Sequence, residues 1–408
     1  MEAHDRIFAI LSRIIHIPLH QYARYFEKYR NMSKNRPVVE LAPPPMLNQF
    51  RDAILREGGP KQKSERDMEQ ELRTRIDAYH MDIFHQTQGE TTKRWTYESE
   101  VKRPYYHVTE LDDGQQANWR KYLDFEQAEG DYARIKFLYE RCVVTAANYD
   151  EFWLRYARWM LAQENKEEEV RSIYQRASCI FVPISKPDIR LFYAQFEESQ
   201  SRADVAIAIY EAILMNLPSH TETILALANT HRRQHGLSSA IELLKKYIDG
   251  TDCTMLTRGT LVTELARLVW TQSGNPEEAR KIYESSKTQF IDCAPFWISW
   301  LKFELQQPSS EAEEPACYTR IKAVFESIRQ SRLPAEIIQD LSNRYFAYLK
   351  ERGGKEAMAE YMLLDQEVHG PGDAATKVAR GQGDKMQIDT VAANKLPAQR
   401  GGPNGMQR

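Results

Sequence analysis

Large aromatic residues recur at helical spacing between residues 115 and 365. Several segments carry two or three rings placed three residues apart, and a glutamate often follows the last ring. Residues at this spacing lie on one face of an α-helix, so each segment predicts a helix with an aromatic face. The rings are Trp119, Tyr122 and Phe125, then Trp153 and Tyr156, and later Trp297, Trp300 and Phe303.

A second pattern follows each of these helices. Segments such as DYARIKFLYERC and PEEARKIYES combine a small residue and an arginine with a ring and a glutamate. Small residues let helices approach closely, and the ring fills the groove between them. The rings of this second pattern are Tyr139, Tyr174, Tyr210 and Tyr283.

Together the two patterns predict about seven helix pairs over residues 115–365. Each pair buries only part of its apolar face and needs its neighbours, which is typical of a repeat protein. Gly130, Gly236 and Gly274 fall between the predicted paired helices, and several prolines mark the boundaries between pairs. We therefore expect an all-α fold, an α-α superhelix (solenoid) of helix pairs similar to TPR repeats.

The rest of the chain divides into three segments. Residues 1–30 contain two helical patterns, the second with Tyr22, Tyr25 and Phe26, and are expected to be a remnant of a preceding array. Residues 31–114 are expected to be a linker, rich in proline and glycine up to residue 64, that holds a long charged helix from about 65 to 88. Residues 366–408 are expected to be a disordered tail.

The stretch KRPYYHV at residues 102–108 has two possible interpretations. Aromatic rings beside cations can stack on bases and bind phosphates, which makes this stretch a candidate contact for RNA or a protein partner. A structural strap that covers the helix pair of Trp119 is the interpretation we favour. The candidate contact residues are Lys102, Arg103, Tyr105, Tyr106 and His107.

The last helix pair is the candidate dimer contact. Its rings and aliphatic residues form an apolar surface that a terminal repeat should not expose unless a partner covers it. The candidate residues are Tyr345, Phe346, Tyr348, Tyr361, Met362 and Leu363.

The composition changes this picture little. The net charge is −3, so no basic excess indicates a nucleic-acid partner. The five cysteines form no C-x-x-C pair and are expected to be buried thiols of a reducing compartment. No segment reaches the roughly 18 apolar residues of a membrane span, and no signal peptide is evident, so we expect a soluble intracellular protein without membrane contact.

Candidate chemistry is sparse. His231 and His235 have the spacing of two metal ligands on one helix, but no third ligand is evident, and an exposed helix end explains them better. Glu126 and Arg134 recur as a type in several repeats, which favours an ion pair between helices over catalysis. We expect no enzyme activity, no metal and no cofactor.

The repeats also resemble a known family. The paired patterns resemble the HAT (half-a-TPR) repeat of RNA-processing proteins, and KRWTYESEVKRPYYHVTELDDGQQANWRKYLDFEQAEGDYARIKFLYERCVV resembles the pre-mRNA-processing factor 39 family. The resemblance covers roughly residues 5–365 and is strongest from 93 to 160. It implies a nuclear, non-enzymatic scaffold of the U1 small nuclear ribonucleoprotein, which selects 5′ splice sites.

The resemblance carries further expectations. Its members have two HAT arrays and dimerise through the C-terminal one, with a second copy or a paralogue. Contact with U1 RNA or pre-mRNA is expected to be indirect, through other subunits of the particle. Most of the N-terminal array, which should precede residue 5, is not in this sequence, so we expect a truncated gene model, an isoform or a fragment.

Three alternatives stay open at this point. The chain could be a HAT scaffold of mRNA 3′-end cleavage or of another spliceosomal complex, a direct RNA-binding protein, or an enzyme of unknown type, although no catalytic constellation supports the last.

Overall fold

The computed structural model describes residues 2–57, 64–308, 310 and 312–369, and within them every regular element is a helix. The chain divides into two compact units after Val182, and each is described by itself. This confirms the predicted all-α repeat fold. Residues 370–408, most of the expected disordered tail, lie outside the described residues, whereas residues 366–369 belong to the last helix.

Unit 1 is built along one long helix, α4 (Glu65–Glu100), which Ser64 caps by accepting a hydrogen bond from the Asp67 backbone N–H. Three helices and a short 3₁₀ turn precede α4, and four helices and a π-helical turn follow it. They are α1 (Glu2–Ile14), α2 (Tyr22–Ser33), η1 (Val38–Glu40), α3 (Pro44–Glu57), α5 (Asp113–Glu129), α6 (Tyr132–Thr145), α7 (Asp150–Leu161), α8 (Glu167–Arg176) and η2 (Ala177–Phe181).

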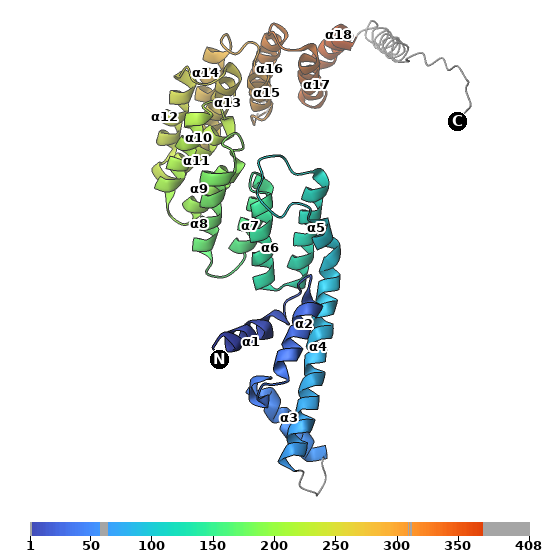
Figure 1. The fold of residues 1–408 in the computed structure, drawn as a ribbon. Helices are drawn as coiled ribbons and strands as arrows, with labels where there is room; N and C mark the ends of the chain where they lie inside the picture. Colours follow the sequence, from blue (N-terminus) through green and yellow to red (C-terminus); the bar gives the residue numbers. More distant parts are fainter. Residues whose placement is uncertain (1, 58–63, 309, 311, 370–408) are drawn as a thin grey trace, which may run out of the picture. The chain divides into compact units, whose positions relative to one another are not determined.

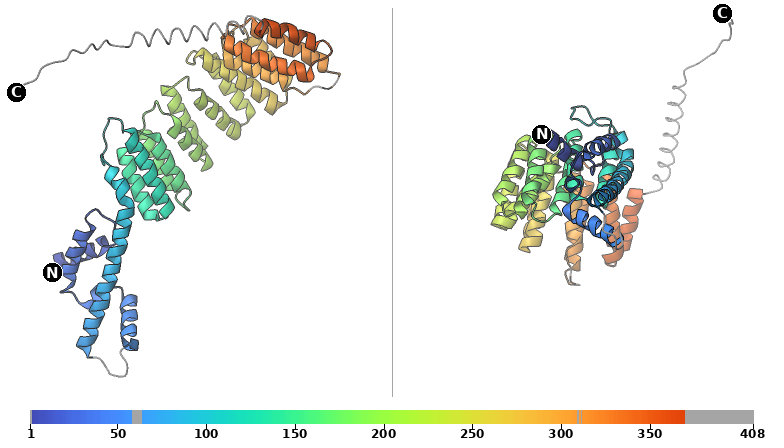
Figure 2. Two further views of the ribbon diagram at one scale, coloured as in Figure 1. Left: turned by 90° about the vertical axis from the view of Figure 1, so that its right-hand side faces the viewer. Right: turned by 60° about the horizontal axis from the view of Figure 1, so that its bottom comes forward.

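The first half of α4 supports the N-terminal helices. Figures 1 and 2 show α2 and α3 beside this half of α4. Ile54 of α3 and Ile76 of α4 are buried in the same apolar cluster. The Tyr29 hydroxyl lies 3.0 Å from His80 Nε2, and this ring nitrogen lies 3.0 Å from the Leu41 carbonyl oxygen, so polar groups inside the cluster have partners.

The expected linker over residues 31–64 needs a correction. Residues 44–57 form helix α3, which packs on α4 and buries Leu47 and Ile54. The prolines at 43–45 suggested a break, but Pro44 and Pro45 stand at the start of this helix, where a missing backbone N–H costs nothing. The charged helix is also longer than expected, reaching residue 100 instead of 88.

The second half of α4 takes part in the repeat. Its Tyr97 stacks on Tyr122 of α5 with ring centroids 5.1 Å apart and planes 6° from parallel. Tyr139 of α6 stacks on Tyr156 of α7 in the same way, at 4.7 Å and 7°. Because the two contacts match, this half of α4 occupies the place of a second helix in front of the first predicted pair.

Unit 2 continues the pattern with five helix pairs. Their helices are α9 (Asp188–Ser199), α10 (Ala203–Asn216), α11 (Thr221–His235), α12 (Leu237–Asp249), α13 (Met255–Ser273), α14 (Pro276–Ser286), α15 (Ala294–Leu305), α16 (Glu314–Arg329), α17 (Ala335–Arg352) and α18 (Ala357–His369). With the pairs α5/α6 and α7/α8 of unit 1, the described residues contain seven pairs after α4.

Similar ring stacks join the last three pairs of unit 2. Tyr283 of α14 stacks on Trp300 of α15 at 5.6 Å, and Phe325 of α16 stacks on Tyr345 of α17 at 4.2 Å. Of the twelve rings assigned to the repeat core from the sequence, all but Phe125 are buried. Phe125 is half-buried, and the guanidinium of Arg94 lies over its ring at 5.3 Å.

Glu126 and Arg134 both form ion pairs between helices, but not with each other as expected. Glu126 is buried and pairs with Arg94 of α4 at 2.5 Å, while Arg134 pairs with Glu90 at 3.0 Å. The long helix supplies both partners, and sequence spacing did not indicate that it lies against α5. In unit 2 the buried Glu304 pairs with Arg280 at 2.9 Å.

Other local expectations have mixed outcomes. Gly130, Gly236 and Gly274 have positive φ and end their helices, as predicted for breaks between paired helices. All five cysteines are free, but Cys179 is exposed, so the expectation of uniformly buried thiols was wrong for that residue. Among the described helices, none combines the length and apolar character needed to cross a bilayer.

Replacing the buried Trp297 by alanine should destabilise unit 2. The substitution removes a ring that is 2% exposed, together with its N–H bond of 3.1 Å to the Phe290 carbonyl oxygen. We expect a loss of about 3–5 kcal/mol in the free energy of unfolding, measured by urea denaturation. The control is M215A, also in unit 2, where an 86% exposed side chain should change it by less than about 0.5 kcal/mol. Equal effects of the two substitutions would contradict the packing described here.

Candidate functional site

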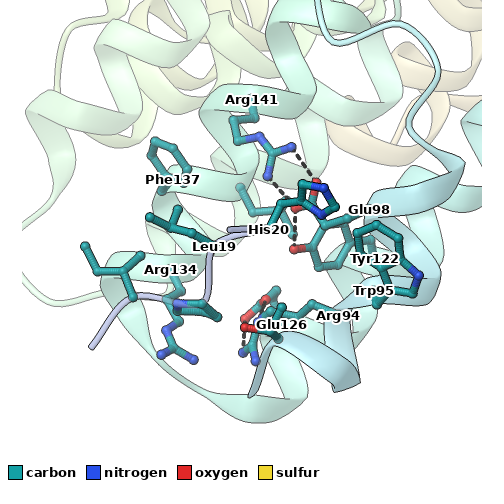
Figure 3. Close-up of a pocket in the computed structure, with 14 residues that line it drawn as sticks. Leu19, His20, Arg94, Trp95, Glu98, Tyr122, Glu126, Arg134, Phe137 and Arg141 are labelled. Carbon is teal, nitrogen blue, oxygen red and sulfur yellow. Dashed lines mark hydrogen bonds and ion pairs between the residues drawn. The ribbon is translucent and has the colours of Figure 1, made fainter. Parts of the chain in front are cut away.

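A cavity of about 410 Å³ in unit 1 lies between the α1–α2 connection and helices α4, α5 and α6. Figure 3 shows its lining, in which charged side chains alternate with rings. The residues labelled there are Leu19 and His20 of the connection, Arg94, Trp95 and Glu98 of α4, Tyr122 and Glu126 of α5, and Arg134, Phe137 and Arg141 of α6.

One side of the cavity is a chain of ion pairs. Arg94 donates to both carboxylate oxygens of the buried Glu126, at 2.5 and 3.0 Å. Its other terminal nitrogen donates to Glu90 at 2.6 Å, and Arg134 donates to the same Glu90 oxygen at 3.0 Å. A buried arginine requires such partners, because an unpaired buried charge would cost several kcal/mol.

A second cluster of hydrogen bonds and ion pairs joins α4, α5 and α6, and the next repeat contains its counterpart. Arg141 donates to both oxygens of Glu98, at 2.6 and 2.9 Å, and the Tyr122 hydroxyl donates to Glu98 at 2.8 Å. The next repeat has the same arrangement around Glu140, which accepts from Arg176 and Tyr156. We call this arrangement of one glutamate, one arginine and one tyrosine the carboxylate clamp.

Titration properties follow from these contacts. Burial opposes ionisation of Glu90, but hydrogen bonds from Lys93, Arg94 and Arg134 outweigh it and lower its pKa to about 2. Burial likewise opposes ionisation of Glu98, yet the hydrogen bonds from Arg141 lower its pKa. Both carboxylates are therefore ionised at neutral pH, and neither is poised to exchange a proton.

The rim of the cavity is apolar and exposed. Ile17, Trp95 and Phe137 are 44%, 48% and 66% exposed. Trp95 also stacks on His20, with ring centroids 5.0 Å apart and planes at 12°. An apolar rim around a charge-paired wall can receive a side chain of a partner protein and can orient it through the polar groups below.

Metal chemistry finds no support in the described parts of the chain. There, no group of three or more histidine, cysteine, aspartate or glutamate side chains is arranged to hold a metal ion. The rings of His231 and His235 lie 5.5 Å apart, and His231 Nδ1 lies 3.2 Å from the Ser239 hydroxyl.

The segment with KRPYYHV lies outside this cavity, between α4 and α5. Its ends are fixed: Gln115 accepts from the Lys102 backbone N–H at 3.2 Å, and the Leu111 backbone N–H donates to the Tyr149 hydroxyl at 2.7 Å. Between these ends Tyr105 is 59% exposed.

The remaining candidate contacts of this segment differ in how free they are. Lys102, Tyr106 and His107 are exposed, while Arg103 is half-buried and donates to the Thr109 carbonyl oxygen at 3.1 Å. The structure therefore keeps four of the five candidate residues accessible, and their role in contacts stays a prediction.

The candidate dimer residues need a correction. Tyr345, Phe346 and Tyr348 are 0%, 4% and 4% exposed, because they pack inside the last pairs and not on the surface. Met362 and Leu363 are 64% and 65% exposed. The sequence pattern could not separate the two groups, since both consist of large apolar residues on helices.

Comparison with known proteins gives the family. The model of the PRP39 C-terminal HAT repeat matches residues 92–233, a range that starts inside α4. Pre-mRNA-processing factor 39 of Schizosaccharomyces pombe is 45% identical over 385 residues, which are 91% of this chain and 63% of that protein. The chain belongs to the pre-mRNA-processing factor 39 family. The human member is 27% identical over 85% of this chain and 53% of its own length.

The chain corresponds to only part of these relatives. It spans between half and two thirds of the length of these two members of the factor 39 family. Cleavage stimulation factor subunit 77 of Arabidopsis thaliana is more distant, at 22% identity over 60% of this chain and 32% of that protein.

Sequence reasoning missed the residues that line the cavity from α4 and from the α1–α2 connection. One signal was available: Tyr97 and Glu98 repeat the ring and glutamate of Tyr139 and Glu140. That match could have identified the end of α4 as a repeat helix. Nothing in the sequence indicated that His20 would stack on Trp95.

The substitution E90Q should make the stability of unit 1 depend less on pH in the acidic range. The folded-state pKa of Glu90 is lowered from 4.5 to about 2, so its stabilising contribution is present above pH 4.5 and is lost as the pH falls toward 2. We expect E90Q to lower the urea midpoint at pH 7 and to flatten its decline between pH 5 and 3. The control, E164Q, changes an exposed glutamate of the same unit. An unaltered pH profile in E90Q would refute this assignment.

Proposed function

We propose that this chain is a non-enzymatic scaffold of pre-mRNA splicing that acts in the nucleus as part of the U1 small nuclear ribonucleoprotein, in 5′ splice-site recognition. Family membership supports the splicing role. The assignment to the U1 particle and to 5′ splice-site recognition is part of the proposal. In this mechanism, rigid helix pairs hold other protein subunits in fixed geometry. This role requires the chain to make or break no covalent bond.

The observation that carries the proposal is the pairing of charges in the α4–α6 cavity. Its three arginines, Arg94, Arg134 and Arg141, are all engaged with carboxylates. Phosphate binding would require them to leave these partners, whereas an apolar side chain can contact the exposed ring of Phe137 directly. The site therefore favours a protein partner over RNA, and contact with U1 RNA or pre-mRNA is proposed to be indirect.

The alternatives receive less support. A role in mRNA 3′-end cleavage is less supported, because cleavage stimulation factor subunit 77 is 22% identical to this chain, whereas pre-mRNA-processing factor 39 of Schizosaccharomyces pombe is 45% identical. Direct RNA binding lacks a cluster of uncommitted cations at the cavity. For an enzyme, the cavity offers carboxylates paired with arginines but no nucleophile next to a base.

We also propose that the chain forms a dimer, with itself or a paralogue, through the exposed stripe of α18. Met358, Met362 and Leu363 are 48%, 64% and 65% exposed; Met358 and Met362 lie on one face of that helix, and Leu363 lies about 100° further round it. Three adjacent exposed apolar side chains on the last described helix favour coverage by a second subunit.

The substitution F137D should reduce association with the U1 particle. It places a charge in the exposed apolar rim, where a partner side chain would have to desolvate it. Tagged chain is recovered from nuclear extract of the organism that encodes it, and co-purifying small RNAs are sequenced. We expect enrichment of U1 RNA over other spliceosomal RNAs with the wild type and at least a several-fold loss with F137D.

The matched control is M215D, which changes an exposed apolar residue far from this cavity in sequence, in unit 2. Its recovery of U1 RNA should equal that of the wild type, and circular dichroism should show that both variants are folded. A wild-type chain that recovers no U1 RNA would argue against the proposed particle. Equal recovery by F137D would argue against this cavity as the contact.

The double substitution M362E/L363E should dissociate the proposed dimer. Two buried carboxylates at the interface would lack partners, while α18 itself should stay folded because both side chains are exposed in the monomer. Light scattering after size-exclusion chromatography should give twice the monomer mass for the wild type and the monomer mass for the variant. A monomeric wild type at micromolar concentration would contradict self-association through α18.

A further inference from the structure

A second, smaller cavity of about 90 Å³ lies beside the segment with KRPYYHV. It is lined by Pro104 of that segment, Trp119 of α5 and Arg141, Val144 and Thr145 of α6. Its volume exceeds the roughly 10–15 Å³ needed for one water molecule several-fold. Arg141 also lines the larger cavity, and both of its terminal nitrogens donate to Glu98.

Two buried polar atoms at this cavity have no partner. Trp119 Nε1 and Thr145 Oγ1 make no hydrogen bond, although the two side chains are only 1% and 3% exposed. Leaving a buried donor unpaired costs about 1–3 kcal/mol. The indole N–H can only donate and the hydroxyl can also donate, so an oxygen acceptor would satisfy both.

The repeat provides an internal comparison. Trp153 and Trp297 begin the same aromatic pattern as Trp119 in their own helix pairs. Trp153 donates its N–H to the Ala147 carbonyl oxygen at 2.8 Å, and Trp297 donates to Phe290 at 3.1 Å. In each case a carbonyl six or seven residues earlier in the chain accepts the bond. Trp119 has no such acceptor, because α5 already begins at Asp113, six residues before it, and the Asp112 carbonyl oxygen accepts from the Gln116 backbone N–H within the helix.

The surroundings of the cavity favour an acidic ligand. Lys102 and Arg103 come directly before Pro104 of the lining, and residues 101–109 carry no carboxylate between the flanking Glu100 and Glu110. Arg103 Nε is a further buried donor without a partner. Tyr105 and Val108 are 59% and 74% exposed and offer apolar area next to these donors.

We propose that this cavity binds the carboxylate of an aspartate or glutamate side chain in a protein partner whose chain runs along residues 102–108. The carboxylate accepts from Trp119 Nε1 and Thr145 Oγ1, and the neighbouring residues of the partner cover Tyr105 and Val108. This site is separate from the α4–α6 cavity, and its test needs only purified chain and peptide, so it does not depend on the proposed function.

The test uses the indole N–H signals of the full chain, which has seven tryptophans, in ¹⁵N-detected NMR. The substitutions W119F, W153F and W297F identify three signals by their loss. The probes are acetyl-Ala-X-Ala-amide peptides with aspartate, asparagine or alanine at X. We expect the Trp119 signal to shift saturably with the aspartate peptide, with at least about threefold tighter binding than the asparagine peptide, because charged acceptors form stronger hydrogen bonds.

The signals of Trp153 and Trp297 should not move, since their N–H groups already donate within the fold. The substitution T145V should weaken binding of the aspartate peptide several-fold while leaving the unfolding midpoint close to that of the wild type. The control T92V changes an exposed threonine of α4 and should leave binding unchanged. A Trp119 signal that the aspartate peptide does not move, as for a cavity that takes water only, would overturn the proposal. Equal shifts with all three peptides would also overturn it.

Discussion

The packing of several consecutive pairs depends on one recurring contact, in which a ring on a second helix stacks on a ring of the next first helix. The contact appears between Tyr139 and Tyr156 in unit 1 and between Tyr283 and Trp300 in unit 2. Such a pair adds roughly 0.5–1.5 kcal/mol beyond the apolar area that it buries, and it fixes how far one helix pair can turn against the next. Without it, single pairs would expose their aromatic faces.

The carboxylate clamps link consecutive helix pairs through hydrogen bonds and ion pairs. In unit 1, Glu98 and Glu140 each accept from one arginine and one tyrosine of the following helices, so these two carboxylates have partners. The same pairing supports the proposed protein contact, because arginines that hold carboxylates of the fold would have to leave these partners to bind phosphates. The exposed rings at the cavity rim add apolar area.

Helix α4 explains why the cavities lie where they do. Its second half serves as a repeat helix, and the connection before α2 lies beside it at the larger cavity. His20 and Trp95 stack at this junction, and the 410 Å³ cavity opens beneath them. The early start of α5 at Asp113 also leaves Trp119 without the carbonyl acceptor that its counterparts have.

The sequence by itself determined the local structure: seven helix pairs, their breaks at Gly130, Gly236 and Gly274, and the buried rings, because these follow from side-chain periodicity and backbone freedom. The family resemblance came from the same residues. Only the tertiary structure decided which rings stay exposed, which arginine pairs with Glu126, and that residues 44–57 form a packed helix. These outcomes depend on contacts between segments such as Arg94 and Glu126, which are 32 residues apart, and no local pattern encodes such a distance.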